Sequence, residues 1–204
     1  MADARFEEKR APATYFDAHF KRDAVKILPG EYYVTARDML IVTVLGSCVS
    51  VCLRDRLAGI GGMNHFMLPG NADTAFGPVS NSARYGCYAM DILINHLLKL
   101  GAERRRLEAK IFGGGRVLQG FTVNQVGDRN AEFVLNYLKT EHIPIIAQDL
   151  LGVYPRKIYF FPATGRVLVK KLRSQHNTTI IDRETEYHEK IATAKVSGDV
   201  EWFK

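Results

Sequence analysis

The chain has 204 residues, of which 47% are hydrophobic, and it carries a formal net charge of +6 at pH 7. This hydrophobic share excludes a chain that is disordered throughout, and no apolar run approaches the roughly 20 residues of a membrane-spanning helix. Three cysteines without framework spacing and the lack of a secretory signal argue against a secreted disulfide scaffold. We therefore expect a cytoplasmic protein without membrane insertion.

Composition divides the chain into three regions. Residues 1–24 show no clean hydrophobic period, which predicts a polar or partly helical N-terminal extension. Residues 25–172 carry almost all of the regular apolar patterning and predict one folded domain. Residues 173–204 are polar apart from scattered isoleucines, and they predict a surface tail that docks through Trp202 and Phe203.

The first half of the domain is rich in strand signals. Residues 39–53 are apolar at almost every position, with an interruption only at Gly46 and Ser47. An apolar run on both faces indicates a single strand buried between two layers. A polar turn at 54–56 leads to a second apolar segment at 60–68, which predicts a neighbouring strand.

Helical and strand-like periods alternate in the rest of the domain. Residues 84–100 have the spacing of an amphipathic helix that stops at Gly101, and residues 128–141 predict a second helix with Asp128 as its N-cap. The other strand-like segments are 31–35, 107–112, 145–148, 157–161 and 166–172, the last two of which predict a hairpin. Strands interspersed with helices argue for an α+β fold with a mixed sheet.

Cys48 and His65 offer the clearest chemistry in the sequence. A thiol beside an imidazole is the minimum equipment for nucleophilic catalysis, because the base eases formation of a thiolate. Gly46 and Ser47 directly precede Cys48, and a kink there would bring the thiol to the surface of a cleft. The same kink would free backbone N–H groups for an oxyanion hole. Strand pairing would bring His65 near, although a lone histidine in an apolar strand is more often a core residue than a base.

The other two cysteines fit the role of small buried hydrophobic side chains. Cys52 lies among aliphatic residues, and Cys87 lies in a helical stripe. With Cys48 and His65 they make four ligand-type residues, but the spacing lacks a second pair on a turn, which argues against zinc. We expect no metal and no cofactor. The three glycines at 113–115 lack a phosphate-loop pattern, so close approach of a substrate or of a neighbouring strand is the simpler account.

Several segments, in this order, resemble a known family. They are LGSCVSVCLRD at 45–55, GGMNHFMLP at 61–69, AKIFGGG at 109–115 and GDRNAEFV at 127–134, followed by GRVLVKKL at 165–172. Over about residues 25–172 the chain is similar to the CheD family of bacterial chemoreceptor glutamine deamidases. The resemblance implies that this region is the catalytic domain. It also implies a β-sandwich-like core flanked by helices, similar in fold to the cytotoxic necrotizing factor deamidase toxins.

The resemblance implies an activity and assigns roles. The family hydrolyses particular glutamine side-chain amides on methyl-accepting chemotaxis receptors to glutamate and ammonia, through a thioester. On this chain Cys48 would be the nucleophile and His65 the general base. The family's upstream threonine would be Thr43, but a regular strand would place it on the face opposite Cys48 unless a bulge intervened. Asn64 and Ser80 are alternatives for orienting His65.

Two further expectations concern the thiol and its surroundings. Backbone N–H groups near Ser47 and Cys48, together with Asn64, are our candidates for the oxyanion hole. A thiol paired with a base would be largely thiolate at neutral pH. We therefore expect alkylating agents to react with Cys48 ahead of Cys52 and Cys87.

The expected partner is the chemoreceptor itself, and a basic domain suits docking on an acidic receptor surface. The resemblance also implies the CheC phosphatase as a partner, since some members of the family bind it. The rival hypothesis is a non-catalytic adaptor that occupies a receptor or phosphatase surface. A nucleic-acid binder would rest on positive charge alone, without an aromatic platform or a recognition helix, so we expect no nucleic-acid partner.

Overall fold

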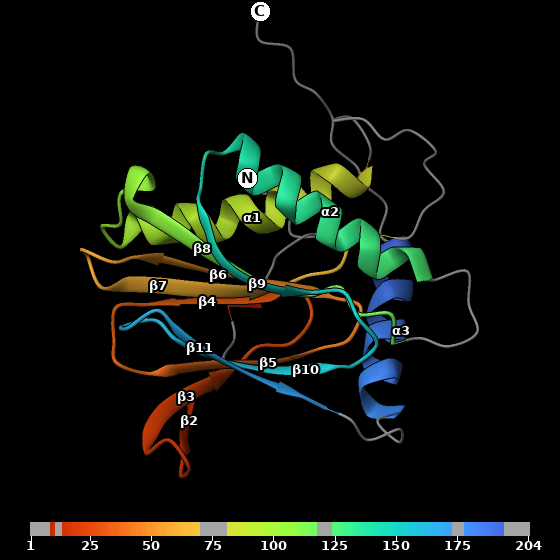
Figure 1. Ribbon diagram of the computed structural model, residues 1–204, viewed down its shortest axis with the longest axis horizontal. Helices are drawn as coiled ribbons and strands as arrows, with labels where there is room; N and C mark the ends of the chain where they lie inside the picture. The colour runs from red at the N-terminus through yellow and green to blue at the C-terminus, as the bar shows by residue number, and fades with distance from the viewer. Residues whose placement is uncertain (1–8, 11–13, 70–80, 118–123, 173–177, 194–204) are drawn as a thin grey trace, which may run out of the picture.

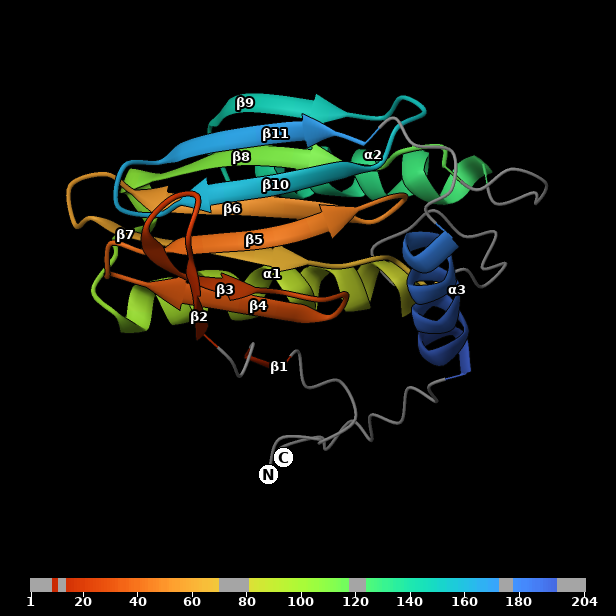
Figure 2. The ribbon, with the colours of Figure 1, turned by 90° about the horizontal axis from the view of Figure 1, so that it is seen from below.

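A computed structural model of the chain describes residues 9–10, 14–69, 81–117, 124–172 and 178–193. In this part of the chain the strands form two sheets that face each other (Figures 1 and 2). The six-stranded sheet has the order β1 (Lys9–Arg10), β4 (Glu31–Thr35), β7 (Ile60–His65), β6 (Val49–Asp55), β8 (Leu107–Gly113) and β9 (Ile145–Leu150). The five-stranded sheet has the order β11 (Arg166–Lys171), β10 (Arg156–Phe161), β5 (Leu40–Leu45), β3 (Arg22–Lys26) and β2 (Thr14–Asp17). Neighbours are antiparallel except for β1–β4, β8–β9 and β3–β5, so both sheets are mixed.

Helices cover one face and one end of this sandwich. α1 (Asn81–Lys99) and α2 (Asn124–Thr140) lie on the outer face of the six-stranded sheet, while α3 (Thr178–Thr193) lies at one end of the two sheets (Figure 1). A short 3₁₀ turn, η1 (Arg104–Arg106), precedes β8. The structure therefore confirms the predicted α+β class, with mixed sheets in a sandwich-like core and flanking helices. The likeness to the toxin fold stays a prediction. None of the described helices is long and apolar enough to span a bilayer.

The predicted stop of the first helix is confirmed in detail. Gly101 has a positive φ of 103°, and the N–H groups of Gly101 and Ala102 donate to the carbonyls of Leu98 and Leu97. This is the pattern in which a glycine in the left-handed region satisfies the last carbonyls of a helix. The helix itself starts at Asn81, one turn earlier than the sequence predicted.

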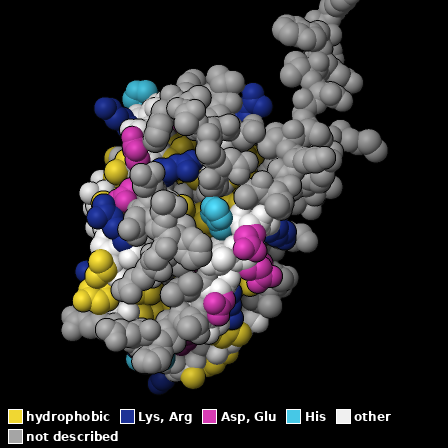
Figure 3. Space-filling view, turned by 90° about the vertical axis from the view of Figure 1, so that its right-hand side faces the viewer, with side chains coloured by type: hydrophobic (Ala, Val, Ile, Leu, Met, Phe, Trp, Pro, Cys, Tyr) yellow, Lys and Arg dark blue, Asp and Glu magenta, His cyan; other side chains and the backbone are white. Residues whose placement is uncertain are grey.

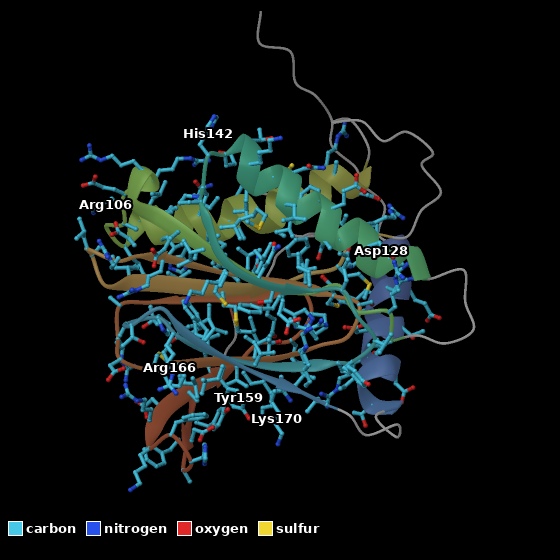
Figure 4. All side chains as sticks on the ribbon, viewed as in Figure 1. Arg106, Asp128, His142, Tyr159, Arg166 and Lys170 are labelled. Carbon is cyan, nitrogen blue, oxygen red and sulfur yellow. The ribbon has the colours of Figure 1, made fainter. Side chains whose placement is uncertain are left out.

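The second helix also starts earlier than predicted, and its predicted N-cap is wrong. α2 begins at Asn124, so Asp128 lies inside the helix. Its carboxylate instead accepts two hydrogen bonds from the Arg116 guanidinium at 3.0 and 3.1 Å (Asp128 is labelled in Figure 4). An acidic residue in the second turn still lies near the positive end of the helix dipole. Acidic residues are therefore common both at and just after an N-cap, and the sequence did not distinguish the two positions.

The prediction of one strand over residues 39–53 is also wrong. β5 belongs to the five-stranded sheet and β6 to the six-stranded sheet, and residues 46–48 carry the chain from one to the other. Each strand has one face on the shared core and a second face under other elements, so the two together read as one apolar run. The crossing between sheets, rather than a bulge in one strand, removes the argument that Thr43 and Cys48 face opposite sides.

Strands and a helix lie in the regions where extensions were expected. β2 and β3 form a hairpin at 14–26, and β3 pairs with β5, so the boundary proposed at residue 25 falls inside a strand. Phe20 of this hairpin packs on Tyr159 and Phe161, at the outer face of the five-stranded sheet (Figure 4 labels Tyr159). At the other end of the chain, residues 178–193 form α3, while Trp202 and Phe203 lie outside the described residues.

Candidate active site

Cys48 and His65 meet at the end of the sandwich near α3. Cys48 immediately precedes β6 and His65 ends β7, and reciprocal hydrogen bonds of 3.0 Å between Val49 and Phe66 hold the two strand ends together. Sγ of Cys48, a ring nitrogen of His65 and a carboxylate oxygen of Glu184 all lie within 4.8 Å of one another. All three side chains are buried, with exposed fractions of 0%, 1% and 2%.

A hydroxyl group fixes the tautomer of His65. The hydroxyl of Thr43 donates to the carbonyl of Ile27 at 2.9 Å and lies 2.8 Å from Nδ1 of His65. A hydroxyl has one proton, and a carbonyl can only accept, so that proton is committed to Ile27. Nδ1 must then carry a hydrogen and donate to Thr43, which leaves the lone pair of the imidazole on Nε2.

The free nitrogen of His65 is suited to act as a base. Nε2 is buried and has no hydrogen-bond partner in the described part of the chain. Burial lowers the pKa of His65 to about 3, so the ring is neutral at physiological pH. A neutral imidazole with its unprotonated nitrogen in the site can accept the proton of a nearby thiol.

The three carbonyls of the 46–48 segment are turned into the protein. The carbonyls of Gly46 and Cys48 accept from the N–H groups of Gly115 and Gly114, at 2.8 and 2.7 Å. The carbonyl of Ser47 accepts from Nδ2 of Asn130, at 2.9 Å. Since each carbonyl has a donor, the segment is held in one conformation by the glycine run that follows β8 and by α2.

The three N–H groups of the same segment converge on one carboxylate. Oε1 of Glu184 accepts from the backbone of Gly46 at 2.7 Å and of Cys48 at 3.2 Å. Oε2 accepts from the backbone and the hydroxyl of Ser47, both at 2.7 Å. Consecutive N–H groups that point at one anion are the arrangement that stabilises an oxyanion during acyl transfer.

The glycine run at 113–115 permits this packing. A Cβ at Gly113 would lie 2.2 Å from the carbonyl oxygen of Cys48, and φ is 110° there. A Cβ at Gly115 would lie 2.8 Å from the carbonyl oxygen of Gly46. Close approach of a neighbouring strand is therefore the reason for the glycines, as one of the two sequence interpretations held.

The thiol does not have the environment that the sequence predicted. We expected Cys48 at the surface of a cleft and largely ionised, but it is fully buried. Burial raises the pKa of the Cys48 thiol well above its ordinary value, and the charge of Glu184 and a hydrogen bond to it add to the effect. In this conformation the thiol is therefore neutral, and both its burial and the charge of Glu184 oppose thiolate formation.

The remaining predicted site residues lie elsewhere. The Asn64 side chain accepts from the N–H of Val51 at 3.0 Å and donates to the carbonyl of Ala89 at 3.2 Å, so it joins β6 to α1 and does not orient His65. Cys52 is buried and Cys87 is half-buried, and burial raises the pKa of both thiols. Ser80 lies outside the described residues.

Cysteine, histidine and glutamate are also metal-ligating residue types, and the ligand atoms of this group lie within 4.8 Å of one another. Both oxygens of Glu184 already accept N–H or O–H bonds, and Nδ1 of His65 is engaged with Thr43. Neither Cys52 nor Cys87 belongs to this group. The geometry therefore suits acid–base chemistry at a thiol better than it suits a closed metal site.

Sequence reasoning missed two residues of the site, Asn130 and Glu184. Asn130 is fully buried and ties Ser47 to the N–H of Leu68, at 2.9 Å each. Nothing in the spacing of a helix reveals such a long-range role. Glu184 did leave a signal, since Ile180, Glu184, Tyr187 and Ile191 recur at the spacing of one helical face.

A thiol, a neutral imidazole oriented by a hydroxyl, and convergent backbone N–H groups are the parts of a cysteine hydrolase. Comparison with known proteins specifies the class. Residues 67–171 match the family model described as CheD chemotactic sensory transduction. The chain belongs to the CheD family.

Curated relatives align over nearly the whole chain. The chain is 61% identical over 197 residues to the probable chemoreceptor glutamine deamidase CheD of Janthinobacterium sp. (strain Marseille), covering 97% of each chain. It is 61% identical to the protein of the same description from Methylobacillus flagellatus, covering 97% of this chain and 98% of the other. For the Shewanella oneidensis probable chemoreceptor glutamine deamidase CheD 1 the identity is 60%, covering 94% and 93%. Among solved structures, Bacillus licheniformis hypothetical protein YfiH aligns with a TM-score of 0.37 and 16% identity over 59% of this chain and 51% of its own, too weak a likeness to inform fold or function.

Proposed function

We propose that this protein is a chemoreceptor glutamine deamidase that hydrolyses side-chain amides of specific glutamines on methyl-accepting chemotaxis receptors. The observation that carries the proposal is the Cys48–His65 pair beside three convergent N–H groups, in a chain of the CheD family. The names of the curated relatives support the choice of glutamine and of chemoreceptors.

The reaction proceeds in two halves. Sγ of Cys48 attacks the amide carbon of the glutamine side chain while Nε2 of His65 takes the thiol proton. The carbonyl oxygen becomes an oxyanion and is held by the N–H groups of residues 46–48. Collapse of this intermediate breaks the C–N bond, and His65 returns its proton to the leaving nitrogen, so that ammonia departs and a thioester remains.

Hydrolysis of the thioester completes the cycle. His65 takes a proton from water, the resulting hydroxide attacks the thioester carbon, and the C–S bond breaks. The proton held by His65 returns to the thiolate, and the product is a glutamate side chain. Thr43 acts as a positioning residue, because its hydroxyl keeps the basic nitrogen of His65 directed into the site.

The proposal also covers setting and partners. We place the reaction in the cytoplasm, where the signalling part of a chemoreceptor lies, and assign Cys48, His65 and Thr43 to a catalytic domain of residues 25–172. The CheC phosphatase is a proposed second partner.

The test is deamidation of a purified cytoplasmic chemoreceptor fragment, followed by peptide mass spectrometry and ammonia release. Wild-type protein is compared with Cys48→Ala and with Cys87→Ala, a matched removal of a half-buried thiol outside the site. We expect glutamine to be converted by the wild type and by Cys87→Ala, and not by Cys48→Ala. Conversion by Cys48→Ala would mean that another residue is the nucleophile. Receptor fragments left intact by every variant with Cys48 in place would contradict the proposal and favour the non-catalytic adaptor.

A further inference from the structure

One face of α3 is directed toward the active site. Ile180, Glu184 and Ile191 are buried at intervals that place them on a single helical face, together with the half-buried Tyr187. The neighbouring Asp182, Arg183 and Glu186 are exposed. The buried side of the helix also carries the half-buried His188, whose Nε2 is buried, and the Glu184 carboxylate projects from it into the site. Figure 3 looks onto the end of the molecule at which α3 lies, where acidic and basic side chains are both visible.

The helix also contacts the domain through residues that follow Glu184. The hydroxyl of Tyr187 is hydrogen-bonded to that of Tyr85 on α1, and the ring lies over Gly30, where a Cβ would approach the Tyr187 hydroxyl to 2.7 Å. Ile191 belongs to the main hydrophobic core. These contacts hold the helix beside the site.

The position of the Glu184 carboxylate is that of the reaction's product. The N–H groups of residues 46–48 that would stabilise the oxyanion all bond to this carboxylate. A glutamate side chain in that position is chemically the same group that deamidation of a glutamine creates. No lysine or arginine in the described residues forms an ion pair with Glu184, whose partners include those donors, the hydroxyl of Ser47 and the thiol of Cys48.

We propose that α3 is an autoinhibitory segment that occupies the substrate site of its own chain, with Glu184 in the place of the product carboxylate. The inference rests on the deamidase function proposed above. A helical receptor segment that presents a glutamine must displace α3 to reach the same N–H groups. Displacement also exposes the Cys48 thiol and removes the negative charge beside it, so one movement opens the site and eases thiolate formation.

The test uses the full chain and two readouts. Glu184→Ala removes the carboxylate, and Glu184→Gln replaces one acceptor oxygen by an amide N–H₂ that opposes the N–H donors. Glu186→Ala is the matched control, because it removes an exposed carboxylate from the same helix. The first readout is the rate at which iodoacetamide labels each cysteine, resolved by peptide mass spectrometry. The second is kcat/KM for deamidation of a receptor fragment.

We expect both Glu184 variants to label Cys48 faster than wild type by about tenfold or more, the factor given by loss of one charge-assisted hydrogen bond. Labelling of the buried Cys52 should stay at the wild-type rate, and Glu186→Ala should behave as wild type in both readouts. Deamidation by Glu184→Ala should exceed that of wild type by a similar factor. Cys52 is an internal control, since it becomes reactive only if the sandwich itself opens.

The outcomes separate this inference from the proposed function. Equal labelling of Cys48 in wild type and both Glu184 variants would overturn autoinhibition, whether or not receptors are deamidated. Parallel gains at Cys48 and Cys52 would also overturn it, because Glu184 would then be a clamp on the whole fold. Selective gain at Cys48 without deamidation by any variant would uphold the occlusion by α3 and reject the deamidase.

Discussion

A buried carboxylate lies at each end of β6, Asp55 at one end and Glu184 at the other, and the two have different roles. At the far end, Asp55 accepts from the N–H groups of Leu57 and Ala58 at 3.0 Å and from that of Glu103 at 2.9 Å. It also accepts from the Arg106 guanidinium at 2.9 Å (Figure 4 labels Arg106). At the near end, Glu184 accepts from three backbone N–H groups, one hydroxyl and the Cys48 thiol.

The difference lies in where the partners come from. Asp55 fixes its own turn and the start of β8, and it has a cation to balance its charge. Burial raises the pKa of Asp55, but the N–H groups of Glu103 and Ala58 and the Arg106 guanidinium outweigh it, so the net pKa is lowered. Glu184 arrives on a separate helix and lies beside a thiol. A carboxylate that stabilises the fold and one that blocks a site can therefore look alike in burial and in number of hydrogen bonds.

Removing the two carboxylates should give the largest contrast. We expect Asp55→Ala to lower the free energy of unfolding by about 3 kcal/mol, because several part-buried donors lose one shared acceptor at once. Glu184→Ala should cost less, about 1–2 kcal/mol, since movement of α3 gives the N–H donors of residues 46–48 to water while it loses part of the burial of the helix. Urea unfolding measures both, with the exposed Asp23→Ala as control. A Glu184→Ala loss as large as that of Asp55→Ala would erase the distinction.

Glycine substitutions probe the same two ends of the strand. Gly113→Ala at the site end should cost about 2–3 kcal/mol and abolish deamidation, because a Cβ would overlap the Cys48 carbonyl. Gly59 lies in the turn that follows Asp55. Its φ is also positive, but a Cβ there would meet nothing within 4 Å, so Gly59→Ala is the matched substitution. It should cost about 1 kcal/mol, the strain of the left-handed region alone, and keep activity. Thermal unfolding and a receptor assay distinguish these results, and equal costs would contradict the packing argument.

The two ends should also respond to different pH ranges. The folded-state pKa of His65, about 3, lies below the ordinary value of 6.5, so between these values the unfolded chain binds a proton that the folded chain excludes. Stability should therefore fall as pH decreases from 6.5, by up to about 1.4 kcal/mol per pH unit. The lowered pKa of Asp55 means that its contribution is lost only at more acidic pH, below the ordinary carboxylate range.

Unfolding measured from pH 6.5 to 5 checks this separation. His65→Gln should flatten the slope in that window, whereas Asp55→Ala should leave the slope unchanged while lowering the stability throughout. An unchanged slope in His65→Gln would show that His65 is not the group excluded from protonation.

The smallest expected effect concerns Thr43. Thr43→Val keeps the shape but removes the acceptor for Nδ1 of His65, and we expect kcat to fall about tenfold through loss of orientation. Thr43→Ser retains the hydroxyl and should keep most of the rate. Steady-state deamidation kinetics at saturating receptor fragment make the comparison. Equal rates for Val and Ser variants would assign Thr43 to packing alone.

Local signals in the sequence predicted most of the fold. The periods of α1 and α2, the hairpin of β10 and β11 and the helix stop at Gly101 all depend on neighbouring residues, and the structure confirms them. The transfer of the chain between sheets at residues 46–48 was missed, because burial on both faces makes two strands look like one. Glu184 was missed for a related reason, since its partners lie more than 130 residues away.

The hydrogen bond between Thr43 and His65 joins the two sheets, since Thr43 lies on β5 and His65 on β7. A slight slippage of one sheet against the other would part these groups while leaving every strand intact. The rate of deamidation should therefore depend sensitively on the relative position of the two sheets. Deamidation should be lost at a lower denaturant concentration than the secondary structure measured by circular dichroism.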